Sequence, residues 1–265
     1  MLAAERQSRI LALLQRRHSA RVAELAHELG VSEVTIRRDL DALDRENLVA
    51  KVHGGATLAQ PAGTDEPGFE AKRHLHRVEK NAIGRAAAQL IQPGLAIGLS
   101  AGTTTWTLAH LVREIPDVTV VTNSPPIADV LAPAPTATDE SVILTGGIRT
   151  PSDALVGPLA VRALQDFNLD IVFLGIHGMH PDAGFTTPNI LEAETNRAFI
   201  AAATRTVVLA DHTKWGIPGL ARIANIERAD VLITDSGLPP AQQQTVSDAL
   251  SRAGGRLITA PIGES

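Results

Sequence analysis

From about residue 77 onward, short apolar segments alternate with segments of helical periodicity. The apolar segments are rich in valine, isoleucine and leucine, which is typical of strands covered on both faces. Alternation of such strands with helices predicts an α/β fold with a mainly parallel sheet. The expected strands are 95–100, 118–123, 141–145, 170–176, 206–210 and 230–234, and the expected helices are 77–91, 104–113, 125–132, 157–166, 190–203 and 240–253.

The first 58 residues have a different pattern, which predicts three amphipathic helices and a small hairpin. Gly30 can end the second helix because glycine tolerates the left-handed conformation, and Ser32 is placed to cap the third. Two short strands are expected within residues 48–56, around a basic tip. The apolar positions at helical spacing are Ile10, Leu13 and Leu14, then Val22, Leu25, Ala26 and Leu29, then Ile36, Leu40 and Leu43.

Residues 20–39 hold a helix, a glycine turn and a second helix, the order found in a helix-turn-helix. In that motif the second helix enters the major groove of DNA, while flanking basic residues hold phosphates. An alternative is a three-helix packing unit with solvated arginines, but the cap, the arginine pair and the wing favour DNA binding. The predicted DNA-binding residues are Arg21, Ser32, Glu33, Thr35, Ile36, Arg37, Arg38, Lys51 and His53.

The charge and the loop composition divide the chain. Residues 1–58 carry nine basic and eight acidic side chains and are therefore +1, so the net charge of −5 leaves −6 on the remainder. Residues 59–68 are rich in proline, glycine and alanine, as linkers are. We expect a winged helix-turn-helix domain at 1–58, a linker at 59–76 and an α/β effector-sensing domain at 77–265.

Composition excludes several classes of site. The 265 residues include no cysteine, so disulfides and thiolate chemistry are absent, and a cytoplasmic location is expected. No apolar run approaches the ~20 residues of a membrane span, so no membrane association is expected.

The strand ends of the second domain carry glycine and polar residues. Residues 102–105 (GTTT) follow a strand and begin a helix, where backbone amides and the helix dipole favour an anion such as phosphate. Open α/β sheets bind ligands at this carboxyl edge. A threonine-capped helix start without a ligand is the alternative. The predicted effector-binding residues are Ser100, Gly102, Thr103, Thr104, Thr105, Thr122, Asn123, Gly146, Gly147, Arg149, His177 and Lys214.

The chain resembles the DeoR-type family of bacterial transcriptional regulators in an ordered series of motifs. They are residues 31–40 (VSEVTIRRDL), 52–56 (VHGGA), 79–84 (EKNAIG), 101–105 (AGTTT), 121–124 (VTNS), 145–147 (TGG), 155–158 (LVGP), 184–188 (GFTTP) and 210–214 (ADHTK).

The resemblance implies a sensor domain with the fold of ribose-5-phosphate isomerase that binds phosphorylated sugars or related metabolites. It places the phosphate at residues 102–105 and the sugar near Asn123, Gly147 and Lys214. Two positions depart from the family pattern: Ser100 stands where aspartate is common, and residues 175–178 read Gly-Ile-His-Gly instead of Gly-Ala-Asp-Gly. Both departures remove a carboxylate, which favours a hydroxyl-rich or more anionic effector.

Three other functions are compatible with parts of the sequence. A sugar-phosphate isomerase or deaminase with a DNA-binding extension would need a base such as Glu192, Glu194 or Asp211, but lost pocket carboxylates argue against an enzyme. A dinucleotide sensor would need a G-x-G-x-x-G fingerprint, which is missing. The third is a protein-interaction module. We expect no cofactor and no metal, although His177 and His180 form an HxxH pair. The expected partners are double-stranded operator DNA, a phosphorylated sugar or similar anionic metabolite, and further copies of the chain in a dimer or tetramer.

Overall fold

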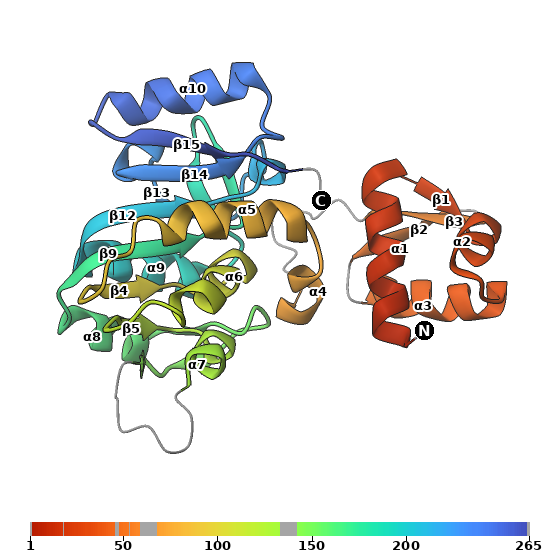
Figure 1. The fold of residues 1–265 in the computed structure, drawn as a ribbon, viewed down its shortest axis with the longest axis horizontal. Helices are drawn as coiled ribbons and strands as arrows, with labels where there is room; N and C mark the ends of the chain where they lie inside the picture. Colours follow the sequence, from red (N-terminus) through yellow and green to blue (C-terminus); the bar gives the residue numbers. More distant parts are fainter. Residues whose placement is uncertain are drawn as a thin grey trace. The chain divides into compact units, whose positions relative to one another are not determined.

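The computed structural model describes residues 2–17, 19–45, 48–52, 54–58, 68–132 and 142–263. The chain divides into two compact units, Met1–Leu75 and His76–Ser265 (Figure 1). A short helix, α4 (Phe69–Arg73), forms within the stretch predicted as linker. Residues 59–67 of that stretch lie outside the described part. No helix in the described part is both long and apolar enough to span a bilayer.

The first unit contains the three predicted helices. They are α1 (Ala3–Arg17), α2 (Val22–Leu29) and α3 (Glu33–Arg45). Gly30 ends α2 in the left-handed conformation, with φ 66° and ψ 36°, as predicted. Their apolar faces enclose a core that includes the fully buried side chains of Ile10, Leu14, Leu25 and Ile36.

The predicted hairpin is part of a three-stranded antiparallel sheet. Strands β2 (Val49–Val52) and β3 (Gly55–Leu58) are the wing strands, and a further strand, β1 (Ser19–Arg21), pairs with the other edge of β3. The strand order is therefore β1-β3-β2. Gly55 is required at the β1–β3 contact, because an added Cβ would lie 2.3 Å from the carbonyl oxygen of Ala20.

The second unit is built on a parallel seven-stranded sheet of order β15-β14-β12-β9-β4-β5-β6. All six predicted strands are present. The seventh strand, β15, forms the edge opposite β6 and was not predicted. The strands are β4 (Ala96–Leu99), β5 (Thr119–Thr122), β6 (Val142–Leu144), β9 (Leu169–Gly175), β12 (Ala203–Leu209), β14 (Val231–Asp235) and β15 (Arg256–Ala260).

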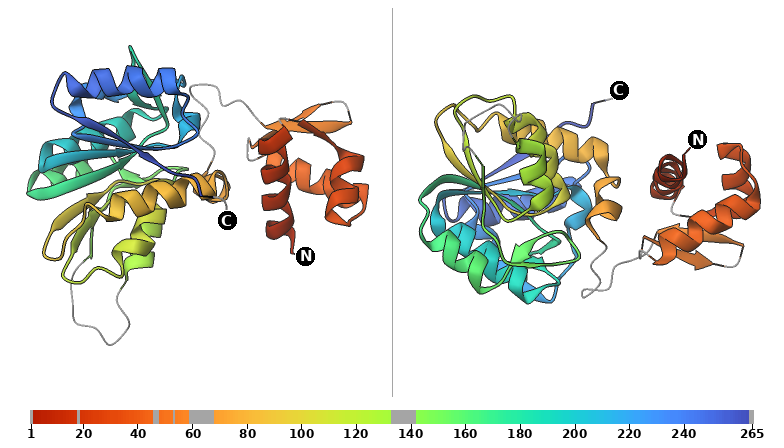
Figure 2. Two further views of the ribbon diagram at one scale, coloured as in Figure 1. Left: turned by 45° about the horizontal axis from the view of Figure 1, so that its top comes forward. Right: turned by 90° about the horizontal axis from the view of Figure 1, so that it is seen from below.

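Helices cover both faces of this sheet (Figures 1 and 2). One core layer joins it to α5 (Arg77–Ala88), α6 (Thr103–Val112) and α7 (Pro125–Leu131). The other joins it to α8 (Pro158–Gln165), α9 (Ile190–Ala202) and α10 (Pro240–Ser251). Successive residues of β9 contribute to opposite layers, with Ile171 and Phe173 in the first and Val172 and Leu174 in the second, so the strand is continuously apolar from Ile171 to Leu174.

Smaller elements complete the second unit. They are the antiparallel sheet β10 (Gly178–His180), β11 (Gly184–Thr187) and β13 (Ala221–Ala224), the strand pair β7 (Ile148–Arg149) and β8 (Leu155–Val156), and the 3-10 helices η1 (His212–Lys214) and η2 (Ile226–Arg228).

The strand order reverses direction between β4 and β9. From β4 the chain proceeds through β5 to β6 on one side, and from β9 through β12, β14 and β15 on the other. Open α/β sheets bind ligands at the carboxyl ends of the two strands beside such a switch point. A ligand site is therefore expected at the residues that follow β4 and β9.

Candidate DNA-binding and effector sites

Helix α3 is fixed at its start by the predicted cap. Ser32 Oγ accepts a hydrogen bond of 3.2 Å from the backbone N–H of Thr35 and lies 2.9 Å from the Thr35 hydroxyl. Farther along, the carboxylate of Asp39 is nearly buried and pairs with Arg6 of α1, whose Nη2 donates at 3.1 Å to Oδ1. The cap fixes the start of α3, and the Arg6–Asp39 pair ties α3 to α1.

The outer face of α3 carries the predicted polar residues. Ser32, Glu33, Arg37 and Arg38 are exposed, and Arg37 pairs with Glu33 over 3.0 Å. The structure adds a residue that the sequence reasoning missed, since Val34 is 64% exposed on the same helix. An exposed valine there has the chemistry to contact a thymine methyl group.

Ile36 is fully buried in the core, so its side chain is not available to bases. It can affect DNA binding only by holding α3. The sequence had already placed Ile36 on the buried side of the helix, which is the placement found. His53, also predicted to contact DNA, lies outside the described residues.

Of the predicted basic residues near the wing, Lys51 has a side-chain partner within the unit, whereas the hydrogen bond of Arg21 is made by its backbone. Lys51 Nζ on β2 lies 2.6 Å from Asp41 Oδ1 of α3, and this hydrogen bond raises the pKa of Lys51 and lowers that of Asp41. The backbone N–H of Arg21 donates to Glu24 Oε2 at 3.1 Å, and its side chain is exposed.

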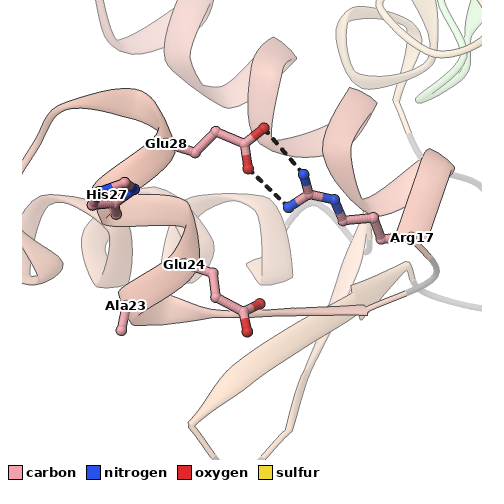
Figure 3. Close-up of a pocket in the computed structure, with 5 residues that line it drawn as sticks. All are labelled: Arg17, Ala23, Glu24, His27 and Glu28. Atoms are coloured by element: carbon pink, nitrogen blue, oxygen red, sulfur yellow. Dashed lines mark hydrogen bonds and ion pairs between the residues drawn. The ribbon is translucent and has the colours of Figure 1, made fainter.

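A hollow on α2 is lined by Arg17, Ala23, Glu24, His27 and Glu28 (Figure 3). Arg17 of α1 donates through Nη1 and Nη2 to Glu28, at 2.8 and 3.3 Å. Two carboxylates beside one already paired arginine suit neither a nucleic-acid phosphate nor an anionic effector. The Arg17–Glu28 pair instead joins the ends of two helices.

The predicted phosphate cradle lies at the switch point. Gly102 precedes α6 with φ 154° and ψ 157°, and residues 103–105 form the first turn, whose amides have no acceptor within the helix. Gly175, the last residue of β9, lies beside Gly102. A Cβ added to Gly175 would be 3.7 Å from Gly102 Cα. Thr103, Thr104 and Thr105 are buried. This geometry offers converging N–H groups to an anion.

Ser100, Thr122 and Asn123 are buried and engaged with the backbone. Ser100 Oγ accepts from Gly175 N–H at 3.0 Å, and Thr122 Oγ1 donates to Leu99 O at 2.7 Å. Asn123 Oδ1 accepts from Ala101 N–H at 2.8 Å, and its Nδ2 donates to Leu155 O at 3.0 Å. These side chains hold the loop before α6 in place, and their predicted contacts with an effector stay a prediction.

The strands β7 and β8 bring further predicted residues together. Gly147 has φ 129°, and a Cβ added there would lie 2.6 Å from Val156 O. Glycine at this position therefore permits the close pairing of β7 and β8. Gly146 also has positive φ. The Arg149 side chain is 65% exposed and pairs with Asp153 over 2.7 Å, so its charge is already partnered.

A carboxylate that the sequence reasoning considered only as a catalytic base lies close to these strands. Glu192 of α9 accepts hydrogen bonds from Thr150 at 2.9 Å, from Thr187 at 3.0 Å and from the Ser152 hydroxyl. These three hydroxyl donors occupy both oxygens of the Glu192 carboxylate.

The carboxyl ends of β12 and β14 carry a second polar cluster, of which only Lys214 was predicted as a ligand contact. Asp211 is fully buried between β12 and η1, and Asp235 ends β14. Lys80, nearly buried on α5, and His76, which precedes α5, contribute charge there. His76 and Lys80 could not be placed at this edge from sequence, because they are far from residue 211 in the chain.

The charges of this cluster determine its protonation. Burial alone would raise the pKa of Asp211, but Lys214, His76, Lys80 and a hydrogen bond from Thr213 lower it to about 2. Burial lowers the pKa of His76, whereas the hydrogen bond to Asp235 raises that of His212. The ring centroids of the two histidines lie 6.1 Å apart in an edge-to-face arrangement.

His177 is half-buried, and its backbone N–H donates to Thr186 O at 3.1 Å. His180 Nδ1 accepts from Asp182 N–H at 3.2 Å. Among the residues that the structure describes, no group of three or more His, Cys, Asp or Glu side chains is arranged to hold a metal ion.

The first unit is a winged helix-turn-helix whose recognition helix, α3, has an exposed outer face. The second is an α/β unit with a switch point of the kind at which such sheets bind ligands. Together they define a class of DNA-binding regulators with a sensor domain. Comparison with known families agrees. Residues 6–62 match the DeoR-like helix-turn-helix domain, and residues 75–236 match the DeoR C terminal sensor domain. The chain belongs to the DeoR family of transcriptional regulators, a family of regulators and not of enzymes.

Relatives match over nearly their whole length. The transcriptional regulator YulB of Bacillus subtilis is 36% identical over 94% of this chain and 95% of its own. The glycerol-3-phosphate regulon repressor of Escherichia coli is 29% identical over 92% and 95%. Among solved structures, ribose 5-phosphate isomerase from Plasmodium falciparum matches with 13% identity and a TM-score of 0.37, over 54% of this chain and 55% of that chain.

Proposed function

We propose that the chain is a repressor of carbohydrate-metabolism genes that binds double-stranded operator DNA, and that a phosphorylated sugar or related anionic metabolite modulates this binding. The observation that carries the proposal is the open first turn of α6 at the switch point, with Gly102 and Gly175 beside it. The glycerol-3-phosphate regulon repressor, a relative whose name contains a phosphorylated metabolite, supports it.

On the DNA side, we propose that Arg37, Thr35 and Val34 of α3 contact base edges and that Arg38, Arg21 and Lys51 contact phosphates. One helix-turn-helix reads too few base pairs for a useful specificity ratio. The protein therefore acts as a homodimer or tetramer on an operator with repeated half-sites.

On the effector side, the phosphate binds the amides of residues 103–105, and the sugar extends along the carboxyl edge of the sheet. The effector can change operator affinity only if it binds the DNA-competent and DNA-incompetent states differently. Release of DNA on effector binding is the proposed direction.

The test begins with operator sequences selected from random duplexes by the full-length protein. Fluorescence anisotropy then gives affinity as a function of salt, and a phosphate-gripping protein should lose affinity steeply as salt rises. A panel of phosphorylated sugars and polyols, with their unphosphorylated forms as controls, is added at saturation. Failure to select any duplex would contradict the DNA-binding role, and an operator affinity that no phosphorylated compound changes would contradict the effector role.

A further inference from the structure

His76 has an unusual conformation at the start of α5. Its backbone is left-handed, with φ 51° and ψ 43°, a region that few residues with a Cβ adopt. It is the N-cap residue of α5, yet its side chain makes no capping hydrogen bond. N-cap residues ordinarily have an extended backbone. The requirements of the helix therefore do not explain the conformation of His76.

The side chain of His76 contacts the carboxyl edge of the sheet instead. Its ring lies edge-to-face on that of His212 in η1, with the ring centroids 6.1 Å apart. His212 is fixed, because its N–H donates to Asp235 Oδ2 at 2.7 Å and its Nδ1 lies 2.8 Å from Asp235 Oδ1. Within the described part of the chain, no hydrogen bond holds the His76 ring. Packing against a fixed neighbour therefore keeps this ring in place.

His76 is also the residue at which the chain enters the sensor unit. The first compact unit ends at Leu75, and the second begins at His76. The two backbone dihedrals of a residue set the direction of the chain on either side of it. A change from left-handed to extended at His76 would leave α5 in place, since an extended residue is the ordinary N-cap. The same change would redirect the residues that come before it.

The His76 ring is surrounded by charged groups of the edge at which the effector is proposed to bind. Asp211, Glu79, Lys214 and Lys80 all act electrostatically on it, and Lys214 is a predicted effector contact. An anionic ligand at this edge changes the field of these groups, and with it the free energy of the ring on its neighbour. A left-handed residue with a Cβ persists only where its surroundings hold it. Weaker holding of the ring therefore favours the extended backbone.

We propose that His76 is a two-state junction that couples effector binding to DNA binding. In the DNA-competent state its ring packs on His212 and its backbone is left-handed. Effector binding displaces the ring, the backbone becomes extended, and operator affinity falls. This inference rests on the proposed function, because it supplies the route by which the effector acts on the DNA-binding unit. His76 is a positioning residue, and no contact with DNA or with the effector is required of it.

Two substitutions separate the ring from the backbone. Neither valine nor asparagine has an aromatic ring, but asparagine tolerates the left-handed conformation and β-branched valine does not. His76→Val should bind the operator about fivefold or more weakly than the free wild type, as the effector-saturated wild type does, and should not respond to ligand. His76→Asn should bind the operator as the free wild type does and lose most of the response.

Fluorescence anisotropy of the full-length proteins measures operator affinity with and without saturating ribose 5-phosphate or glycerol 3-phosphate. Asp117→Val is the matched control, because Asp117 also has a left-handed backbone, at φ 56°, but precedes β5 at the opposite edge of the sheet. It should lower the melting temperature, as His76→Val does, and keep the full ligand response. A folded His76→Val or His76→Asn that responds like the wild type overturns the proposal.

A measurement on the wild type gives the answer if the variants do not fold. Trypsin cleaves after arginine, and Arg73 and Arg77 lie on either side of the junction. Saturating ligand should speed cleavage at these two sites, identified by intact mass, and leave cleavage after the exposed Arg113 unchanged. Unchanged cleavage beside His76 in a wild type whose operator affinity does fall overturns the junction alone. If neither ligand changes the operator affinity of the wild type, the proposed effector role fails, and the junction fails with it.

Discussion

Gly102 shows how one residue without a side chain makes the cradle possible. Its φ of 154° belongs to the region that L residues rarely adopt, and a Cβ would lie 3.2 Å from Thr105 Oγ1. The same missing side chain leaves the first-turn amides of α6 open. The effect of a substitution on the backbone must therefore be separated from its effect on the site.

Gly102→Ala is expected to destabilise the protein by roughly 1–3 kcal/mol through backbone strain and to abolish binding of phosphorylated ligands. Gly94→Ala is the matched control, because Gly94 also has positive φ, at +86°, but its Cβ would meet nothing within 4 Å. Denaturant unfolding should show a loss of stability in both variants, and calorimetry should show a loss of binding only in Gly102→Ala. Normal phosphate binding by folded Gly102→Ala would contradict the cradle.

Arg38 is exposed on α3 and, unlike Arg37, has no ion pair to another described residue. Arg38→Ala should weaken binding to all duplexes about equally and reduce the slope of log K against log salt by about 0.9. Anisotropy titrations over a salt series measure that slope. Arg162→Ala, which removes an exposed arginine from α8 of the sensor unit, should leave it unchanged, and an unchanged slope in Arg38→Ala would remove Arg38 from the interface.

Residue-scale prediction succeeded where the signal is local. The end of α2 at Gly30, the cap of α3 at Ser32 and the helix start at residues 102–105 were predicted because each acts within one turn of its own helix. An anion at residues 102–105 stays a prediction. Val34 was assigned neither to the buried positions nor to the DNA-binding residues, and only the packing shows that it is exposed.

At the scale of elements, α3 depends on α1 through the Arg6–Asp39 pair, whose side chains are only 13% and 5% exposed. Breaking a buried pair leaves an uncompensated charge, whereas an exposed pair contributes little. The position of the recognition helix should therefore be sensitive to a residue that touches no DNA.

Arg6→Ala is expected to lower both the melting temperature and the operator affinity. Arg9→Ala on the same helix breaks the exposed pair with Glu5, at 60% and 50% exposure, and should change neither. Circular dichroism melts and anisotropy titrations of the two variants provide the comparison. Equal melting temperatures for them would show that the Arg6–Asp39 pair does not anchor α3.

The elements that the sequence failed to predict share a physical cause. Strand β15 at the sheet edge is half exposed, so it lacks a continuous apolar run. Strands β1, β7 and β8 are only two or three residues long and exist through their pairing. Strand β11 is fully buried but contains Thr186 and Thr187, which the surrounding hydrogen bonds satisfy. In each case the tertiary structure supplies what the local pattern lacks.

At the scale of the whole molecule, the sensor's charge cluster should make stability depend on pH. The folded pKa of Asp211, about 2, is below the ordinary 3.8, so its contribution is present above about pH 4 and is lost as pH falls towards 2. Asp235 shifts in the same direction. The raised pKa of His212 acts oppositely, with stability present below its ordinary pKa of 6.5 and lost as pH rises through the folded value.

The free energy of unfolding, measured from pH 7 to pH 2, should therefore fall between about pH 4 and pH 2. Asp211 alone should account for a loss on the order of 2 kcal/mol. Asp211→Asn should be less stable at pH 7 and should have a shallower acid limb. Parallel pH profiles for the wild type and the variant would contradict an ionised, charge-stabilised Asp211.

The separate cores of the two units have an evolutionary consequence. Among the residues that the structure describes, the cluster of the first unit shares no side chain with the two layers around the seven-stranded sheet. Mutations on the face of α3 and mutations along the carboxyl edge of the sheet can accumulate without repacking each other's interior. Gene duplication could thus give the same metabolite signal a new set of promoters, or the same promoters a new signal.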